Sequence, residues 1–133
     1  MNTELLNKVM PIAKSVRAWT QAKANRANYN PDNLCGWCAI SAAHLFRQLS
    51  KAGIKSELHY VPGHCFVVVE DHVVDVTATQ FRYYERTEIM IAHIKEVDHN
   101  WYYQTSKIFD NPSKLRDHQL KNNWPRREIA YTR

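Results

Sequence analysis

Residues 34–49, LCGWCAISAAHLFRQL, decide the fold of this chain, because they place two cysteines at the expected start of a helix. The composition favours that helix from about Gly36 to Ala52, and Gly53 supplies its C-terminal stop. Small side chains near its start let the first turns pack closely under a sheet: Ala39, Ser41, Ala42 and Ala43. At the buried N-terminal end of such a helix, the side chain of Cys38 can point outward from the helix.

Before this stretch, the sequence predicts helices and then a loop. The section from about Thr3 to Ala27 is rich in helix formers. Its apolar residues recur at steps of three and four, which gives one apolar face: Leu5, Leu6, Val9, Ile12, Val16 and Trp19. Pro11 is expected to divide this section into a short first helix and a longer second one. NYNPDN, residues 28–33, is dense in turn formers and predicts a loop.

Beyond Gly53 the hydrophobic period changes from that of helices to that of strands. Short strands are expected at 54–61, 64–69, 72–77 and 88–94. A late helix is expected over 111–125, with Asn111 as its cap and Pro112 at its first position. Helices followed by antiparallel strands indicate the α+β fold class. The helix that carries Cys38 would then pack on a small antiparallel sheet.

The length and composition favour a single globular domain over residues 1–133. The 44% of hydrophobic residues exclude a disordered chain, and no apolar run approaches the roughly 20 residues that cross a bilayer. The first residues lack the layout of a signal peptide, and an odd count of three cysteines favours a reducing compartment. We therefore expect a cytoplasmic protein with no membrane partner, although secretion without a signal peptide stays open.

The net charge of +5 comes from basic residues that are scattered along the chain. Scattered lysines and arginines usually form a solvated surface, and no dense basic cluster accompanies a known nucleic-acid-binding motif. The charge therefore permits a nucleic-acid partner, but the pattern does not favour one.

Cys35 and Cys38 admit four interpretations. As a metal pair they need two further ligands, and His64 with Cys65 are the candidates. Adjacent residues on a strand point to opposite faces, which disfavours a shared zinc ion. As a redox pair the cysteines have the C-x-x-C spacing of oxidoreductases, but the βαβ pattern around such motifs is missing. Both thiols could also only pack, since free cysteine is among the most buried residue types.

The fourth interpretation is a nucleophile. Cys38 lies at the expected N-terminus of a helix, where unpaired backbone N–H groups and the helix dipole favour a thiolate and could hold an oxyanion. A thiol nucleophile needs a histidine base, and the base needs an acceptor that orients it. GHCFVVVEDHVVDVT, residues 63–77, offers His64 and Asp75 for these roles. An aspartate flanked by valines in an apolar strand is costly to bury unless it is paired.

The pairing of these two residues depends on the turn between their strands. If Glu70 and Asp71 form a two-residue turn, His64 faces Thr77, and Asp75 lies on the same face of the sheet. Asp75 is then diagonal to His64 and within its reach. A register slip of one residue would move Asp75 to the opposite face.

CGWCAIS, residues 35–41, resembles the nucleophile segment of papain-like cysteine proteases, in which the second cysteine of a C-G-x-C run opens the central helix. The longer GWCAISAAHLFRQLSKAGI is similar to the transglutaminase-like branch of that superfamily. In that branch a histidine follows on a strand and an aspartate ends the next strand. The resemblance covers about residues 34–81 and implies a catalytic triad of Cys38, His64 and Asp75.

The chain departs from the family pattern at several positions. The glutamine that precedes the nucleophile of papain-like enzymes is absent, so Asn30, Asn33 or another donor would have to hold the oxyanion. Val76 stands where transglutaminase-like members often carry a proline. HNW, residues 99–101, is similar to the asparagine–tryptophan pair of papain-like enzymes but lies far beyond His64.

The resemblance implies a cysteine-dependent enzyme that transfers acyl groups from amide bonds of protein or peptide substrates. Water would resolve the thioester in proteolysis or glutamine deamidation, and an amine would resolve it in cross-linking. This chemistry implies no cofactor and no metal. The alternatives are a non-catalytic binding module on the same fold and a zinc or redox C-x-x-C protein.

Overall fold

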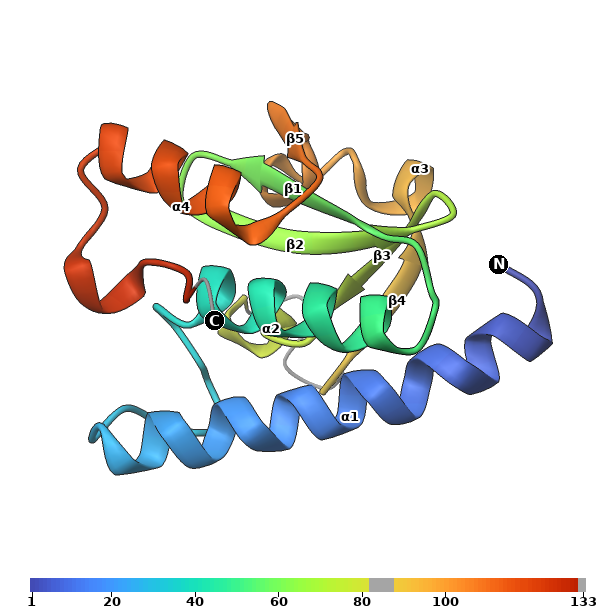
Figure 1. The fold of residues 1–133 in the computed structure, drawn as a ribbon, viewed down its shortest axis with the longest axis horizontal. Coiled ribbons are helices and arrows are strands. Elements are labelled where there is room, and N and C mark those ends of the chain that lie inside the picture. Colours follow the sequence, from blue (N-terminus) through green and yellow to red (C-terminus); the bar gives the residue numbers. More distant parts are fainter. Residues whose placement is uncertain (82–87, 132–133) are drawn as a thin grey trace.

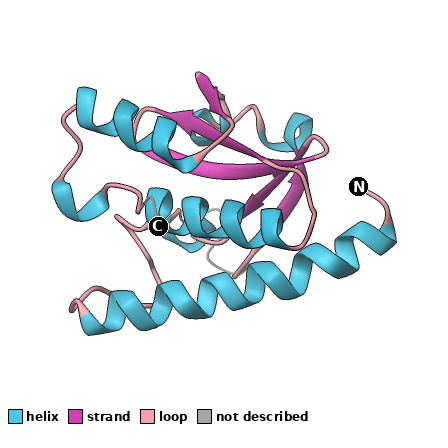
Figure 2. Ribbon diagram, viewed as in Figure 1, coloured by secondary structure: helices cyan, strands magenta, loops and turns pink. Residues whose placement is uncertain are grey.

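The computed structural model describes residues 1–81 and 88–131, and it has the α+β fold that the sequence predicts. Its strands form one antiparallel sheet in the order β4-β3-β2-β1-β5 (Figure 1 and Figure 2). In chain order the strands are β1 (Glu57–Val61), β2 (His64–Val69), β3 (His72–Asp75), β4 (Met90–His93) and β5 (Lys107–Phe109).

Two long helices lie on one side of the sheet (Figure 1). α2 (Cys38–Lys51) packs on β2 and β1, and α1 (Thr3–Arg26) lies against α2 on the side away from the sheet. The shorter helical elements are η1 (Ala78–Gln80), α3 (Ile94–Val97), η3 (Trp101–Tyr103), α4 (Pro112–Lys121) and η4 (Arg126–Glu128). Among the described helices, none combines the length and the apolar character needed to cross a membrane.

α1 runs unbroken through Pro11, so the expected division into two helices is wrong. A proline cannot donate a hydrogen bond to the carbonyl four residues earlier, which here belongs to Asn7. Both residues are exposed, so water can satisfy that carbonyl. The apolar face continues on both sides of the proline, with Val9 and Val16 buried in the same cluster as α2. Packing therefore outweighs the one lost hydrogen bond.

α2 begins two residues later than the sequence suggests. Gly36 has a φ of +89°, a left-handed conformation that lies outside the helix, and Trp37 is the N-cap. Cys38 is consequently the first residue of the helix. At the other end Gly53 has a φ of +75° and stops the helix as predicted.

The hairpin of β2 and β3 has the predicted register. Glu70 and Asp71 have φ values of +45° and +64°, which are typical of a type I′ turn, and the residues on either side of the turn pair directly. His64 and Asp75 therefore lie on one face of the sheet, together with Phe66. Cys65 and the alternate valines of β2 face the other way, toward α2.

β5 was not predicted from the sequence. It pairs with β1 over three residues, which is too short for a recognisable alternation of polar and apolar positions. α4 begins as predicted, because Asn111 accepts a hydrogen bond from the N–H of Lys114 at 3.0 Å and Pro112 occupies the first position. The helix ends at Lys121, which is earlier than the expected residue 125.

Candidate functional site

The candidate nucleophile is the first residue of α2. Cys38 is 3% exposed and belongs to the core between α2 and the sheet. The N-cap residue Trp37 makes no capping hydrogen bond with its side chain. The first N–H groups of α2 therefore have no acceptor within the helix or at its cap. Together with the helix dipole, these groups favour an anion at Cys38.

The candidate base and its orienting acceptor are in direct contact. His64 is the first residue of β2 and Asp75 is the last residue of β3. The distance between His64 Nε2 and Asp75 Oδ2 is 2.8 Å, and both side chains are buried. Because a carboxylate only accepts hydrogen bonds, Nε2 carries the proton of this bond. The other ring nitrogen, Nδ1, is not bonded to Asp75 and is available for proton transfer.

Asp75 accepts three further hydrogen bonds. The hydroxyl of Tyr103 donates to Oδ2 at 2.8 Å, while Thr77 donates its backbone N–H to Oδ1 at 2.9 Å and its hydroxyl to the same oxygen at 3.1 Å. Burial raises the pKa of Asp75, but the positive charge of His64 and these donors outweigh it and lower the pKa. Asp75 therefore stays ionised and holds the imidazole ring in place.

Cys38 and His64 shift each other's pKa in opposite directions. A hydrogen bond from Cys65, acting against burial and supported by His64, lowers the pKa of Cys38 to about 5. Burial lowers the pKa of His64, but Asp75 and Cys38 outweigh it and raise that pKa to about 9. Within the described part of the chain, His64 Nδ1 is buried with no hydrogen-bond partner of its own. Between these two pH values the site holds a thiolate beside an imidazolium.

Cys65 is a neighbour of the nucleophile that the sequence did not assign to the site. It follows His64 on β2 and points to the opposite face, into the core that contains Cys38. Burial, and after it the hydrogen bond and charge of Cys38, raise the pKa of Cys65 well above its ordinary value. The Cys65 thiol thus stays protonated and donates a hydrogen bond to the thiolate.

The alternative sites that use Cys35 have little geometric support. Cys35 is exposed on the loop before α2, and all three cysteines are free. Over residues 1–81 and 88–131, no group of three or more His, Cys, Asp and Glu side chains could hold a metal ion. The expectation that the protein needs no metal stays a prediction, which elemental analysis of the purified protein tests.

The asparagines considered as oxyanion donors or histidine partners serve local structure. The side-chain oxygens of Asn30 and Asn33 accept hydrogen bonds from backbone N–H groups of their own loop, at 2.9 to 3.3 Å. Asn100 caps η3 and is not bonded to His64. The backbone N–H groups at the start of α2 are therefore the donors that the fold offers beside Cys38.

A hollow of about 340 Å³ lies beside the site, between the β1–β2 turn and the segment that follows α4. Its lining residues are Gly63, Asn122, Asn123, Trp124, Pro125 and Glu128. Gly63 directly precedes His64 in the chain, and Glu128 packs over Gly36, two residues before Cys38. This hollow therefore lies next to residues that flank the nucleophile and its base in the chain.

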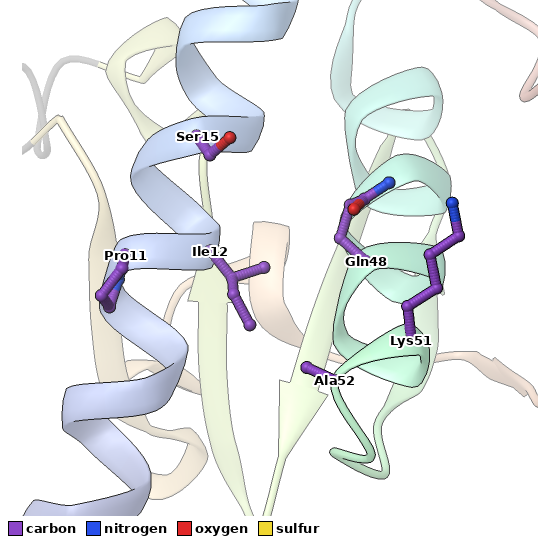
Figure 3. A pocket seen from close by; sticks show the side chains of 6 residues that line it. All are labelled: Pro11, Ile12, Ser15, Gln48, Lys51 and Ala52. Carbon is purple, nitrogen blue, oxygen red and sulfur yellow. The ribbon is translucent and has the colours of Figure 1, made fainter.

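A second hollow, of about 420 Å³, lies between α1 and the C-terminal end of α2 (Figure 3). Ile12 and Ser15 line it from α1, and Gln48 and Lys51 line it from α2 (Figure 3). Gln48 is ten residues after Cys38 in the same helix, which corresponds to about 15 Å along the helix axis. The second hollow is therefore separate from the site.

Tyr103 and Cys65 are the two site residues that sequence reasoning missed. Tyr103 follows Asp75 by 28 positions and lies in a 3₁₀ turn, so no spacing pattern connects the two residues. Cys65 carried a usable signal, because the alternation of β2 that turns His64 to one face turns Cys65 toward the helix of Cys38.

Comparison of the chain with models of protein families, with curated proteins and with solved structures finds no match.

Proposed function

We propose that the chain is a cysteine-dependent acyl-transfer enzyme with a papain-like or transglutaminase-like domain, acting on amide bonds of protein or peptide substrates. The observation that carries this proposal is the buried array of Cys38, His64 and Asp75. Its thiol has a pKa of about 5 and its imidazole a pKa of about 9, and the imidazole is held by a carboxylate at 2.8 Å. A buried thiolate–imidazolium pair at a helix N-terminus is the arrangement that nucleophilic catalysis by cysteine needs.

The reaction follows from the charges at the site. The thiolate of Cys38 attacks the amide carbonyl carbon, and the carbonyl oxygen gains the negative charge. The N–H groups at the start of α2 stabilise that oxyanion. His64 then gives its Nδ1 proton to the amine that leaves, and a thioester on Cys38 remains. Water or a second amine, deprotonated by His64, attacks the thioester and regenerates the thiolate.

A non-catalytic binding module on the same fold is the second candidate. The 3% exposure of Cys38 favours it, because a substrate carbonyl must reach the sulfur. The two candidates differ in one property: only the enzyme forms and then resolves an acyl group on Cys38.

The test uses p-nitrophenyl acetate, which reports an acyl-enzyme whatever the natural substrate is. We expect a burst of nitrophenol, with the acetyl group on Cys38 by mass spectrometry, followed by its loss as the thioester hydrolyses. Cys38→Ala should abolish the burst, His64→Ala should slow both steps, and Cys35→Ser should change neither. Acetylation that is absent or spread equally over the cysteines would contradict the proposal.

A further inference from the structure

The hollow beside the site contains one carboxylate that is close to the nucleophile. The carboxyl carbon of Glu128 lies 3.6 Å from the position that a Cβ on Gly36 would occupy, and Gly36 is two residues before Cys38. Burial, and after it the charge of the Cys38 thiolate, raise the pKa of Glu128. The two groups are therefore within electrostatic range of each other.

Among the described residues, no cation is in direct contact with this carboxylate. Glu128 has no hydrogen bond and no salt bridge from its side chain to any residue in the ranges 1–81 and 88–131. The charge of the neighbouring Arg127 lowers the pKa of Glu128 but is outweighed by burial and by Cys38, and the Cζ atom of Arg127 lies 5.5 Å from the centroid of the Tyr29 ring. A half-buried carboxylate without a partner is unfavourable, and a bound cation would remove that cost.

An indole ring lines the same hollow. Trp124 is half-buried, its ring centroid is 6.0 Å from that of Tyr60, and its Nε1 donates a hydrogen bond to the Tyr60 hydroxyl at 3.5 Å. These contacts hold the ring in place. An aromatic face and a carboxylate in one hollow are the two groups that recognise an ammonium or guanidinium ion in proteins.

We propose that Glu128 and Trp124 form a subsite that binds a cationic side chain, of the lysine or arginine type, on the substrate of Cys38. The identity of that substrate as a protein or peptide rests on the function proposed above. The presence of a cation-selective subsite beside the thiol rests only on the hollow and its lining. The two statements can therefore fail separately.

The first experiment compares two small reagents that alkylate Cys38: cationic 2-bromoethylamine and neutral iodoacetamide. The ratio of their rates, measured by mass spectrometry on residue 38, cancels any change in the thiolate content of Cys38. We expect Glu128→Gln to lower this ratio about three- to fivefold and Trp124→Leu to lower it about twofold. Glu96→Gln, which removes an exposed charge on α3, should leave it unchanged. A ratio that Glu128→Gln does not lower, or that Glu96→Gln lowers equally, overturns the subsite.

The second experiment needs no reaction at the thiol. Nα-acetyl-lysine amide and Nα-acetyl-norleucine amide are titrated by NMR into the Cys38→Ser protein and into its Glu128→Gln derivative. We expect the lysine compound alone to shift the indole N–H signal of Trp124, and Glu128→Gln to remove that shift. Equal effects of both compounds would overturn the subsite. If the Cys38→Ser protein binds the lysine compound selectively while the wild type forms no acyl-enzyme with p-nitrophenyl acetate, the subsite is kept and the proposed function is contradicted.

Discussion

His64 Nε2 and Asp75 Oδ2 are 2.8 Å apart, and neither side chain is more than 2% exposed. In such a dry environment opposite charges interact far more strongly than in water. This interaction is the main reason why His64 has a pKa near 9 although burial alone lowers it. The thiolate and the imidazolium consequently coexist from about pH 5 to about pH 9.

Asp75→Asn should lower the upper pH limit at which the thiolate and the imidazolium coexist. Without the carboxylate the pKa of His64 falls, so the imidazolium is lost at a lower pH than in the wild type. Above the pKa of His64 the Cys38 thiolate no longer has a cationic neighbour and is a stronger nucleophile, so the alkylation rate of Cys38 should leave its plateau and rise at a lower pH than in the wild type. We expect a smaller loss of activity than the about 10⁴-fold that this change costs in a serine triad, because the thiolate is already formed.

The measurement is the rate of iodoacetamide labelling at residue 38 against pH, with circular dichroism to show that the variant is folded. Superimposable profiles for the wild type and Asp75→Asn would remove Asp75 from the site and leave at most a Cys38–His64 pair.

Tyr103→Phe should weaken the hold on Asp75 without removing its charge. The variant loses one hydrogen bond to a buried carboxylate, which costs about 1.5 kcal/mol of unfolding free energy. Urea denaturation checks this value, and Tyr102→Phe is the matched control because Tyr102 stacks on Phe81 through its ring. Equal losses of unfolding free energy in the two variants would show that the hydrogen bond from Tyr103 to Asp75 adds no stability of its own.

Cys65→Ala should raise the pKa of Cys38. The alanine removes the thiol that donates to the Cys38 thiolate, so labelling of Cys38 should need a higher pH on the acid side of the profile. Cys65→Ser retains a donor and should restore most of the wild-type profile, whereas Cys35→Ser should leave it unchanged. An acid limb that does not move in Cys65→Ala contradicts the donor role.

Pro11→Ala should stabilise the protein. Alanine restores the hydrogen bond to the Asn7 carbonyl and suits a helix interior better, although the unfolded chain gains freedom, so we expect a net gain of about 1–2 kcal/mol. Pro112→Ala is the control, because Pro112 is at the first position of α4, where proline fits. Thermal unfolding of both variants measures the difference. A Pro11→Ala protein that is less stable than the wild type would show that the proline relieves strain in α1.

The pairing of His64 with Asp75 could be predicted from the sequence, because the turn and the strand register that bring the two residues together follow local rules. Glu70 and Asp71 make a two-residue turn, the turn sets the register, and the register sets the faces. The existence of α2 followed from local composition, but its start was predicted two residues too early, because the left-handed conformation of Gly36 keeps that residue outside the helix.

The contacts that depend on long-range packing could not be predicted. Tyr103 reaches Asp75 from a 3₁₀ turn, β5 adds three residues to the sheet edge, and Glu128 returns from the segment after α4 to cover Gly36. At Pro11 a local rule failed. Proline predicted a break in the helix, but the burial of one continuous apolar face keeps α1 unbroken.

The most direct test of the thiolate–imidazolium pair is the pH dependence of Cys38 alkylation in the wild type and in His64→Ala. In the wild type we expect residue 38 to be labelled before Cys35 and Cys65, with a rate that reaches half of its plateau near pH 5. In His64→Ala the rise should move to higher pH, because the thiolate loses its positively charged neighbour. A wild-type Cys38 that titrates near the ordinary thiol value of about 8.5, or a profile that His64→Ala leaves in place, would contradict the pair.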